Sequence, residues 1–264
     1  MKSLDRFRSQ ELEQILTSRI DSVIPTDEEF LQKALNGESA RVQTINLHHL
    51  ALGLQDPVFN ETIRTADYVT ADGWPVVRMF RVLGKNVHRV TGASFIEELT
   101  FSHEGEGRLI GLLGATTDVG DEWETMLATH DRKLVLRDHG LAEDWNAPEL
   151  ARRAMEVGVD ILVIAVTPPR GDNFARELRE AGFPGVIVPV GGAIDMVTGH
   201  RPRAPKWAQT WGIEWFHRLL SEPGRLWRRY MLECVPMMIK FAPIALRRKL
   251  QGARHVVTPG RDHA

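Results

Sequence analysis

The sequence is poor in cysteine and has no long apolar run. Cys234 is the single cysteine among 264 residues, so the chain can form no internal disulfide and no cysteine-built metal site, which suits a reducing compartment. The first residues, MKSLDRFRSQELEQ, lack the apolar region of an export signal. The most apolar late stretch, residues 231–246, contains charges and prolines and is shorter than the roughly 20 residues of a spanning helix. We therefore expect neither export nor membrane spanning.

Several catalytic and metal-binding motifs are also missing. The chain has no CxxC pair, no HExxH sequence, no Walker-type loop, no nucleophile elbow and no DxD metal–nucleotide motif. Nothing in the sequence requires a metal or another cofactor. Hydrophobic residues make up 43% of the chain, which is enough for a sizeable core.

Charge is distributed unevenly along the chain. The formal net charge is −2, but residues 201–250 hold 11 Lys/Arg and 3 Asp/Glu, a formal charge of +8. Residues 251–264 add +1, and residues 1–200 carry −11. An acidic body with a basic segment predicts a negatively charged partner, either nucleic acid or an anionic lipid surface.

Strand and helix patterns alternate up to about residue 200. The apolar or β-branched segments that read as strands are 41–46, 66–73, 108–115, 133–137, 160–166 and 186–190. Helical patterns lie between them, one opened by the capping-box pair Thr26 and Glu29. This alternation predicts an α/β fold with a mainly parallel sheet flanked by helices.

After residue 200 only helical patterns remain, and we expect breaks at Pro223, Pro236 and Pro243. The sequence therefore predicts four segments. They are an N-terminal helical extension (1–21), an α/β domain (22–200), a basic helical appendage (201–250) and a flexible tail (251–264).

Ligands of parallel sheets bind at the carboxyl ends of the strands, where polar residues occur in this chain. Asp72 follows a strand and can act as a general base or cap the next helix. Thr44 and Asn46 share one face of a strand and suit sugar hydroxyls, although Asn46 can instead cap a helix. His48 and His49 are adjacent on a helix and do not share a face, which argues against a histidine metal site.

Glycine turns and cations occur elsewhere in the chain. A glycine turn lets backbone N–H groups approach a phosphate, and a nearby cation or carboxylate can bind phosphate or a sugar hydroxyl. The residues of this kind are Arg89, Thr91, Gly92, Gly114, Gly191, Gly192, Asp195, Arg203 and Lys206. The structural alternative for Gly114 is a tight turn between strand and helix, and for Asp195 a helix cap.

The basic segment combines arginine with tryptophan. Its cations are Arg218, Arg225, Arg228 and Arg229, and its tryptophans include Trp207, Trp211, Trp215 and Trp227. The arginines suit phosphate groups or lipid headgroups, and the tryptophans favour an interface, because tryptophan prefers half-apolar surroundings. The alternatives are a solvated basic face and the core of an added helical layer.

A series of short segments occurs in a characteristic order. They are TIN at 44–46, ADYVTADG at 66–73, RVTG at 89–92, GGAID at 191–195, RAPKW at 203–207, GIEW at 212–215, RLL at 218–220, EP at 222–223 and RLWRRY at 225–230. Together they resemble the WecG/TagA/CpsF glycosyltransferases, glycosyltransferase family 26. The resemblance covers about residues 22–245, and the block from 191 to 230 is its most specific part.

The resemblance implies a Rossmann-like body and a C-terminal helical appendage that meets the membrane. It implies an inverting, metal-independent transfer of a sugar from a UDP-sugar to a sugar on a polyprenyl diphosphate lipid. Such enzymes act in exopolysaccharide, teichoic acid and enterobacterial common antigen synthesis. The protein is accordingly expected in the cytoplasm, peripheral at the inner face of the cell membrane.

The resemblance also assigns roles. Asp72 becomes the general base, and Thr44 and Asn46 become sugar contacts. The turn at 191–195 becomes part of the nucleotide site, while Arg218, Arg225 and Arg228 face the diphosphate.

One segment departs from the family pattern. The family commonly has a Gly-x-Pro-Lys-Gln-Glu-like segment after the strand at 160–166, whereas this chain has TPPRGD at 167–172, with Gly171 at the glutamine position. This difference favours glucose as the donor sugar, with N-acetylmannosamine as the alternative.

Two other classes of function remain open at this stage. One is a nucleic-acid-binding protein, which the acidic body argues against. The other is a non-catalytic membrane scaffold, which the retained Asp72 and Arg89 argue against. The sequence is compatible with a homo-oligomer but does not indicate the oligomeric state.

Overall fold

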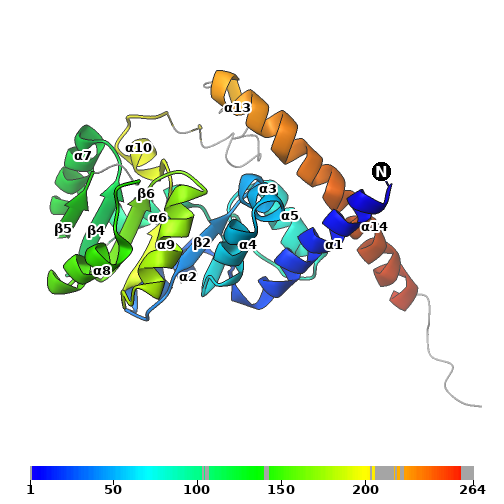
Figure 1. Ribbon diagram of the computed structural model, residues 1–264, viewed down its shortest axis with the longest axis horizontal. Coiled ribbons are helices and arrows are strands. Elements are labelled where there is room, and N and C mark those ends of the chain that lie inside the picture. The colour runs from blue at the N-terminus through cyan, green and yellow to red at the C-terminus, as the bar shows by residue number, and fades with distance from the viewer. Residues whose placement is uncertain are drawn as a thin grey trace, which may run out of the picture.

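The structure is a computed structural model, and the residues it describes are 2–102, 104, 107–139, 143–202, 204–205, 217, 219–220 and 223–256. Figure 1 shows an α/β body from which a long C-terminal helix runs diagonally outward, past the N-terminal helix. The first helix and the last therefore lie together at one end of the molecule.

The strands form two parallel sheets that meet edge to edge. The strands are β1 (Val23–Ile24), β2 (Val42–Ile45), β3 (Tyr68–Ala71), β4 (Leu109–Gly114), β5 (Lys133–Asp138), β6 (Ile161–Ala165) and β7 (Val186–Pro189). Their order is β1–β3–β2 in one sheet and β5–β4–β6–β7 in the other, and all of these pairings are parallel. A parallel bridge between Arg41 and Ile187 joins β2 to β7. The carboxyl ends of the strands therefore lie along one edge, called the carboxyl edge below.

The helices that precede the basic segment cover both sheets. They are α1 (Lys2–Ser18), η1 (Ile20–Ser22), α2 (Asp27–Leu35), α3 (Leu47–Gln55), α4 (Pro57–Arg64), α5 (Trp74–Val82), α6 (Gly92–Phe101), α7 (Thr117–Ala128), α8 (Ala147–Glu156), α9 (Arg170–Glu180) and α10 (Ala193–Val197). As the capping-box pattern predicted, the Thr26 side chain accepts the Glu29 N–H at the start of α2.

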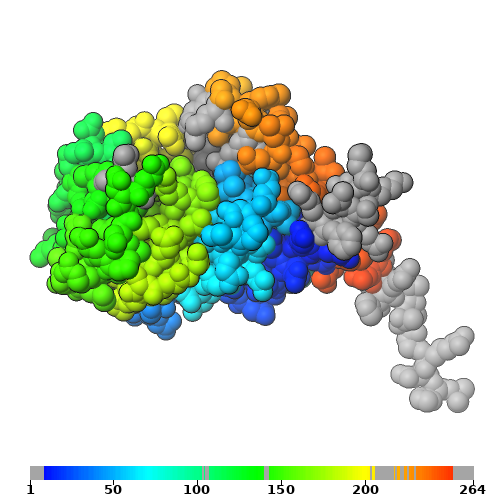
Figure 2. Space-filling model, viewed as in Figure 1, coloured from blue at the N-terminus to red at the C-terminus, as the bar shows by residue number. Residues whose placement is uncertain are grey.

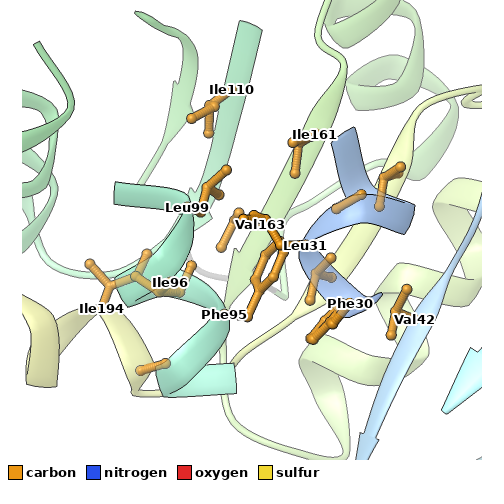
Figure 3. Packing of buried hydrophobic residues seen from close by; sticks show 14 of the residues in the cluster. Phe30, Leu31, Val42, Phe95, Ile96, Leu99, Ile110, Ile161, Val163 and Ile194 are labelled. Carbon is orange, nitrogen blue, oxygen red and sulfur yellow. The ribbon is translucent and has the colours of Figure 1, made fainter. Parts of the chain in front are cut away.

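The core lies on both faces of the sheet. On β6, Ile161 and Val163 pack with α2, α6, α7 and α10, whereas Leu162 and Ile164 pack with α8 and α9. Figure 3 shows the first of these clusters. Residues two apart on a strand share a face, so a strand buried on both faces reads as a continuous apolar run. The α/β fold with parallel sheets flanked by helices, as predicted, is confirmed.

Aromatic stacking fixes two helices within that cluster. Phe30 of α2 and Phe95 of α6 lie with ring centroids 4.3 Å apart and an interplanar angle of 21° (Figure 3). Both are almost fully buried. This contact ties α2, the helix before β2, to α6, the second helix after β3, and so anchors the loop between α5 and α6 that carries Arg89.

The C-terminal helix differs from the expectation. Residues 223–256 form α13 (Pro223–Arg229), the π-helix η2 (Tyr230–Cys234) and α14 (Val235–Val256), with no interruption. The predicted breaks at Pro236 and Pro243 are therefore wrong. Pro236 lies in the first turn of α14, next to the wider turns of η2, and Pro243 lies inside the helix. The helix also continues past residue 250, where the sequence predicts a tail.

Tertiary packing explains why α14 tolerates an internal proline, which alone costs an isolated helix about 3 kcal/mol. Met237, Phe241 and Ile244 are buried in a cluster shared with α1, α3 and α5. On α1, Glu13 pairs with Arg247 and Arg248. Burial of one helix face thus outweighs the local proline penalty.

The opposite face of the same helix is exposed. Its uncovered apolar side chains are Trp227, Leu232, Val235, Met238, Ile239, Leu246 and Leu250. In the space-filling view the helix, orange to red, lies along the outside of the molecule (Figure 2). None of the described helices is long and apolar enough to cross a bilayer.

Candidate active site

The carboxyl ends of β2 and β3 bring Asn46 and Asp72 together. The strands are neighbours, with Ile45 opposite Ala71, and the Asp72 N–H donates to the Ile45 carbonyl at 2.8 Å. The side-chain nitrogen of Asn46 lies 3.5 Å from Asp72 Oδ2. Asp72 is half-buried and does not cap α5, whose N-cap is Gly73 with no side-chain cap bond. The capping interpretation of Asp72 is therefore wrong.

Asn46 caps α3 and faces Asp72 at the same time. Its Oδ1 accepts the N–H of His48 at 3.0 Å and that of His49 at 3.2 Å. Since two backbone donors occupy Oδ1, the side-chain nitrogen must be the atom that faces Asp72. The two interpretations of Asn46 are therefore compatible, because one amide atom caps the helix and the other points at the carboxylate.

Thr44 precedes Asn46 on the same face of β2. It pairs in register with Thr70 of β3, and the two threonines are 5% and 0% exposed. Thr44 therefore lies deeper than Asn46 and Asp72, which are the accessible members of this group.

The loop carrying Arg89, Thr91 and Gly92 lies beside the same strand ends. The Val90 N–H donates to the carbonyl of Ala71 at 3.1 Å, directly before Asp72 in the chain. Arg89 is half-buried in this loop. The loop thus brings a cation to the carboxyl edge next to the candidate base.

Thr91 and Gly92 have evident structural roles within that loop. The Thr91 side chain accepts the Ser94 N–H at 3.0 Å and so caps α6. A Cβ at position 92 would lie 3.3 Å from the Cα and Cβ of Val190. Gly92 therefore allows α6 to begin directly against the end of β7, where the glycine turn starts.

The glycine turn after β7 is open to a ligand. Gly191 has φ +55°, and a Cβ built there meets nothing closer than Thr167 Cα at 4.0 Å. At Gly192 a Cβ would lie 2.7 Å from Arg201 Nη1 and 3.3 Å from Asp195 Oδ2. Asp195 is not the cap of α10, whose N-cap is Gly192. The turn therefore brings half-buried glycine backbone, a carboxylate and a guanidinium together. Arg201 is a further candidate residue, and no sequence motif singles it out.

Two glycines pack against Val166, just after β6. Gly114 has φ +86°, and its Cβ would lie 2.7 Å from a Val166 methyl group. At Gly171 a Cβ would lie 2.3 Å from the Val166 carbonyl oxygen. No side chain fits at position 171 without moving the backbone, so this chain has no room for the glutamine of the family pattern. The neighbouring Asp172 points inward and is 2% exposed.

Asp172 belongs to a buried polar cluster with Gln43 and His49, which sequence analysis did not identify. Gln43 Nε2 donates to Asp172 Oδ1 at 2.5 Å, and His49 Nε2 lies 3.3 Å from the same oxygen. Of the two adjacent histidines, His48 pairs instead with Glu233 of η2. Their separate partners agree with the expectation that the two rings do not form one metal site.

The basic segment is only partly described. Arg203, Lys206 and Arg218 lie outside the described residues, and only the backbone of Arg225 and Arg229 is described. Arg228 is exposed on α13. Across the described residues, no group of three or more His, Cys, Asp or Glu side chains could hold a metal ion.

The strongest pKa change lies at the opposite edge of the sheet. Arg41, before β2, is 1% exposed, and burial lowers the pKa of its guanidinium to about 10, partly offset by Asp67. It donates to the Thr62 carbonyl and to Thr65 Oγ1, both at 2.9 Å. This buried cation is still protonated at neutral pH and holds the junction of the two sheets.

The chain matches the model of a known protein family. The model of the Glycosyl transferase WecG/TagA/CpsF family matches residues 14–254. The matched range includes the strand ends, the glycine turn and most of the C-terminal helix, so it covers every residue of the candidate site.

Proposed function

Because the chain belongs to the WecG/TagA/CpsF glycosyltransferase family, we propose that it transfers a sugar from a UDP-sugar to a polyprenyl-diphosphate-linked acceptor. Membership makes the protein a glycosyltransferase of cell-surface polysaccharide synthesis, a class that uses a nucleotide-sugar donor and a lipid-linked acceptor. The finer parts of the proposal are UDP as the nucleotide, glucose as the sugar and exopolysaccharide as the product.

The observation that carries the proposed mechanism is the pairing of Asp72 with Asn46 at the carboxyl edge. In the proposed reaction Asp72 accepts the proton of the acceptor hydroxyl as that oxygen attacks the anomeric carbon. The C–O bond to UDP breaks as the new glycosidic bond forms on the opposite face, which inverts the anomeric configuration. Asn46 holds the carboxylate in place through its side-chain N–H.

The glycine turn supports the proposed site of the leaving group. Gly191 and Gly192 are half-buried at the same edge, with Arg201 beside Gly192, and a glycine turn lets backbone N–H groups approach a ligand. Preorganised donors of this kind stabilise developing negative charge. We propose that they, with Arg89 and the arginines of the basic segment, neutralise UDP without a metal ion, while Asp195 holds a hydroxyl of the nucleotide.

The exposed face of α13 and α14 supports a peripheral membrane location. Trp227, Ile239 and Leu246 are 57%, 67% and 60% exposed on a helix that also carries the basic residues Arg228 and Lys249. Apolar side chains bordered by cations are typical of helices that lie in the membrane interface. We propose that this helix meets the inner face of the cell membrane, where a lipid-linked acceptor is found.

Binding to anionic vesicles is expected to weaken strongly as salt rises. Each cation near an anionic surface contributes about 1 kcal/mol, so screening two of them weakens binding roughly 30-fold. The measurement is co-sedimentation with vesicles at low salt and at about 0.5 M salt, where the Debye length is roughly 4 Å. Neutral vesicles serve as the control, and binding that is unchanged by salt would contradict electrostatic docking.

Transfer from a single UDP-sugar is the expected result of a donor panel. The panel contains UDP-glucose and UDP-N-acetylmannosamine, a short-chain polyprenyl-diphosphate-sugar acceptor and EDTA, with product followed by mass. UDP-glucose is expected to be used, since the TPPRGD segment differs from the family pattern. Product from UDP-N-acetylmannosamine alone would show that the proposed donor sugar, glucose, is wrong. Activity that needs an added divalent ion would overturn the metal-free mechanism. No product from any donor would favour a non-catalytic scaffold.

A further inference from the structure

A chain of contacts leads from the buried Asp172 to the candidate base. Asp172 lies on α9, 129 residues from Gln43, its hydrogen-bond partner on β2. His49 lies on α3, and its two ring nitrogens face different partners. Nε2 lies 3.3 Å from Asp172 Oδ1, and Nδ1 lies 3.3 Å from the backbone nitrogen of Asn46. The ring therefore stands between the buried carboxyl group and the residue that contacts Asp72.

The partners of His49 determine its tautomer. The Asn46 N–H is a donor, so Nδ1 must be the acceptor and carries no proton. The ring proton then lies on Nε2 and points at the Asp172 oxygen. A histidine whose two nitrogens have such different partners is held in one orientation.

This arrangement fixes Asn46 on every side. Its backbone N–H is held by Nδ1 of His49, its Oδ1 by two backbone N–H groups, and its side-chain nitrogen faces Asp72. Gln43, His49 and Asp172 are at most 4% exposed. Burying polar groups costs stability unless they are paired, and an apolar trio would fill the same space without that cost.

We propose that Asp172 and His49 are positioning residues, which hold Asn46 and through it orient the Asp72 carboxylate. The inference rests on the proposed role of Asp72. Asp172 acts through its hydrogen-bond acceptor Oδ1, which serves both Gln43 and His49. The segment that departs from the family pattern thus carries a functional contact at its inward-facing carboxyl group, next to the position where no side chain fits.

Replacing the acceptor should lower turnover without weakening substrate binding. For Asp172→Ala we expect kcat to fall about 10- to 100-fold with KM within about twofold, since small misplacement of a catalytic group has effects of that order. Asp172→Asn keeps an acceptor oxygen and should restore most of kcat. His49→Asn keeps an acceptor for the Asn46 N–H, so its kcat should likewise be higher than that of His49→Ala.

A double-mutant cycle distinguishes positioning from simple destabilisation. If Asp172 acts through Asn46, then Asp172→Ala should change kcat less than about threefold in an Asn46→Ala background. The matched control is Thr62→Val, which removes a partly buried hydrogen bond to Asn173, the neighbour of Asp172 on α9, and should leave kcat within about twofold. The proposal would be overturned if the double variant lost kcat by the product of the two single losses. It would also be overturned if the asparagine variants had kcat values as low as the alanine variants.

The histidine tautomer provides a test that needs no turnover. In ¹⁵N spectra of histidine-labelled protein, with the signal assigned by its loss in His49→Asn, we expect a proton on Nε2 and none on Nδ1. A proton on Nδ1 overturns the positioning network whatever the donor sugar is. If the tautomer is as expected but the wild-type protein transfers no sugar, the proposed function fails instead.

Discussion

Asp72→Asn is expected to lower kcat by about 10²- to 10⁴-fold, the range that a general base contributes. The asparagine keeps the size of the side chain and an oxygen for the Asn46 side chain, 3.5 Å away, but it cannot accept the proton of the acceptor hydroxyl. Substrate binding should change little, so the loss should fall on kcat and not on KM. The measurement is steady-state kinetics with the donor identified in the panel.

Asp56→Asn is the matched control for this variant. Asp56 follows the end of α3, whereas Asp72 follows a strand, and Asp56 caps α4 by accepting the Val58 N–H at 2.9 Å. Asparagine caps a helix as well as aspartate does, so activity should be unchanged. Full turnover of Asp72→Asn at saturating substrate would show that another group removes the proton.

Phe241→Ala is expected to lower the free energy of unfolding by about 3–5 kcal/mol, the usual cost of truncating a buried phenylalanine. Phe241 is 5% exposed and packs in a cluster with α1, α3 and α5. The large effect follows because α14 completes that core. The measurement is chemical denaturation followed by circular dichroism.

Ile239→Ala, two positions earlier on the same helix, should affect vesicle binding and leave the stability of the fold almost unchanged. Ile239 is 67% exposed, so its truncation should change the unfolding free energy by no more than about 0.5 kcal/mol while weakening vesicle binding. Equal stability of the Phe241 and Ile239 variants would contradict the packing of α14 on the body. A loss of vesicle binding only in the Phe241 variant would contradict the outward-facing apolar surface.

Much of the site could be predicted because its parts lie at strand ends. A strand such as β6 is recognised from its own apolar run, and the rule for parallel sheets then predicts that Asp72, Asn46 and Gly191 meet at one edge. The close approach of Asp72 to Asn46 agrees with that prediction. The roles of these residues in binding and catalysis stay predictions until the variants are assayed.

Long-range contacts could not be predicted in this way. Gln43 and Asp172 are 129 residues apart and His48 and Glu233 are 185 residues apart, and no local pattern relates them. In the sequence His49 stands out only beside its neighbour His48, and Asp172 only as part of a segment that departs from the family pattern. The pairing of Asn46 with His49 as a capping box was the available local signal.

The sequence by itself determined the order of β2 to β7 and of the helices between them, the helix cap at Thr26 and the residues that follow these strands, because these depend on neighbours a few positions apart. The two-residue strand β1 was not predicted, because it is defined by its pairing with β3. Tertiary structure decided the rest. The helix α14 continues past Pro243 because burial of Phe241 and Ile244 outweighs the local cost of proline. Tertiary structure also gave His49 its tautomer, because that depends on which groups the fold places around the ring.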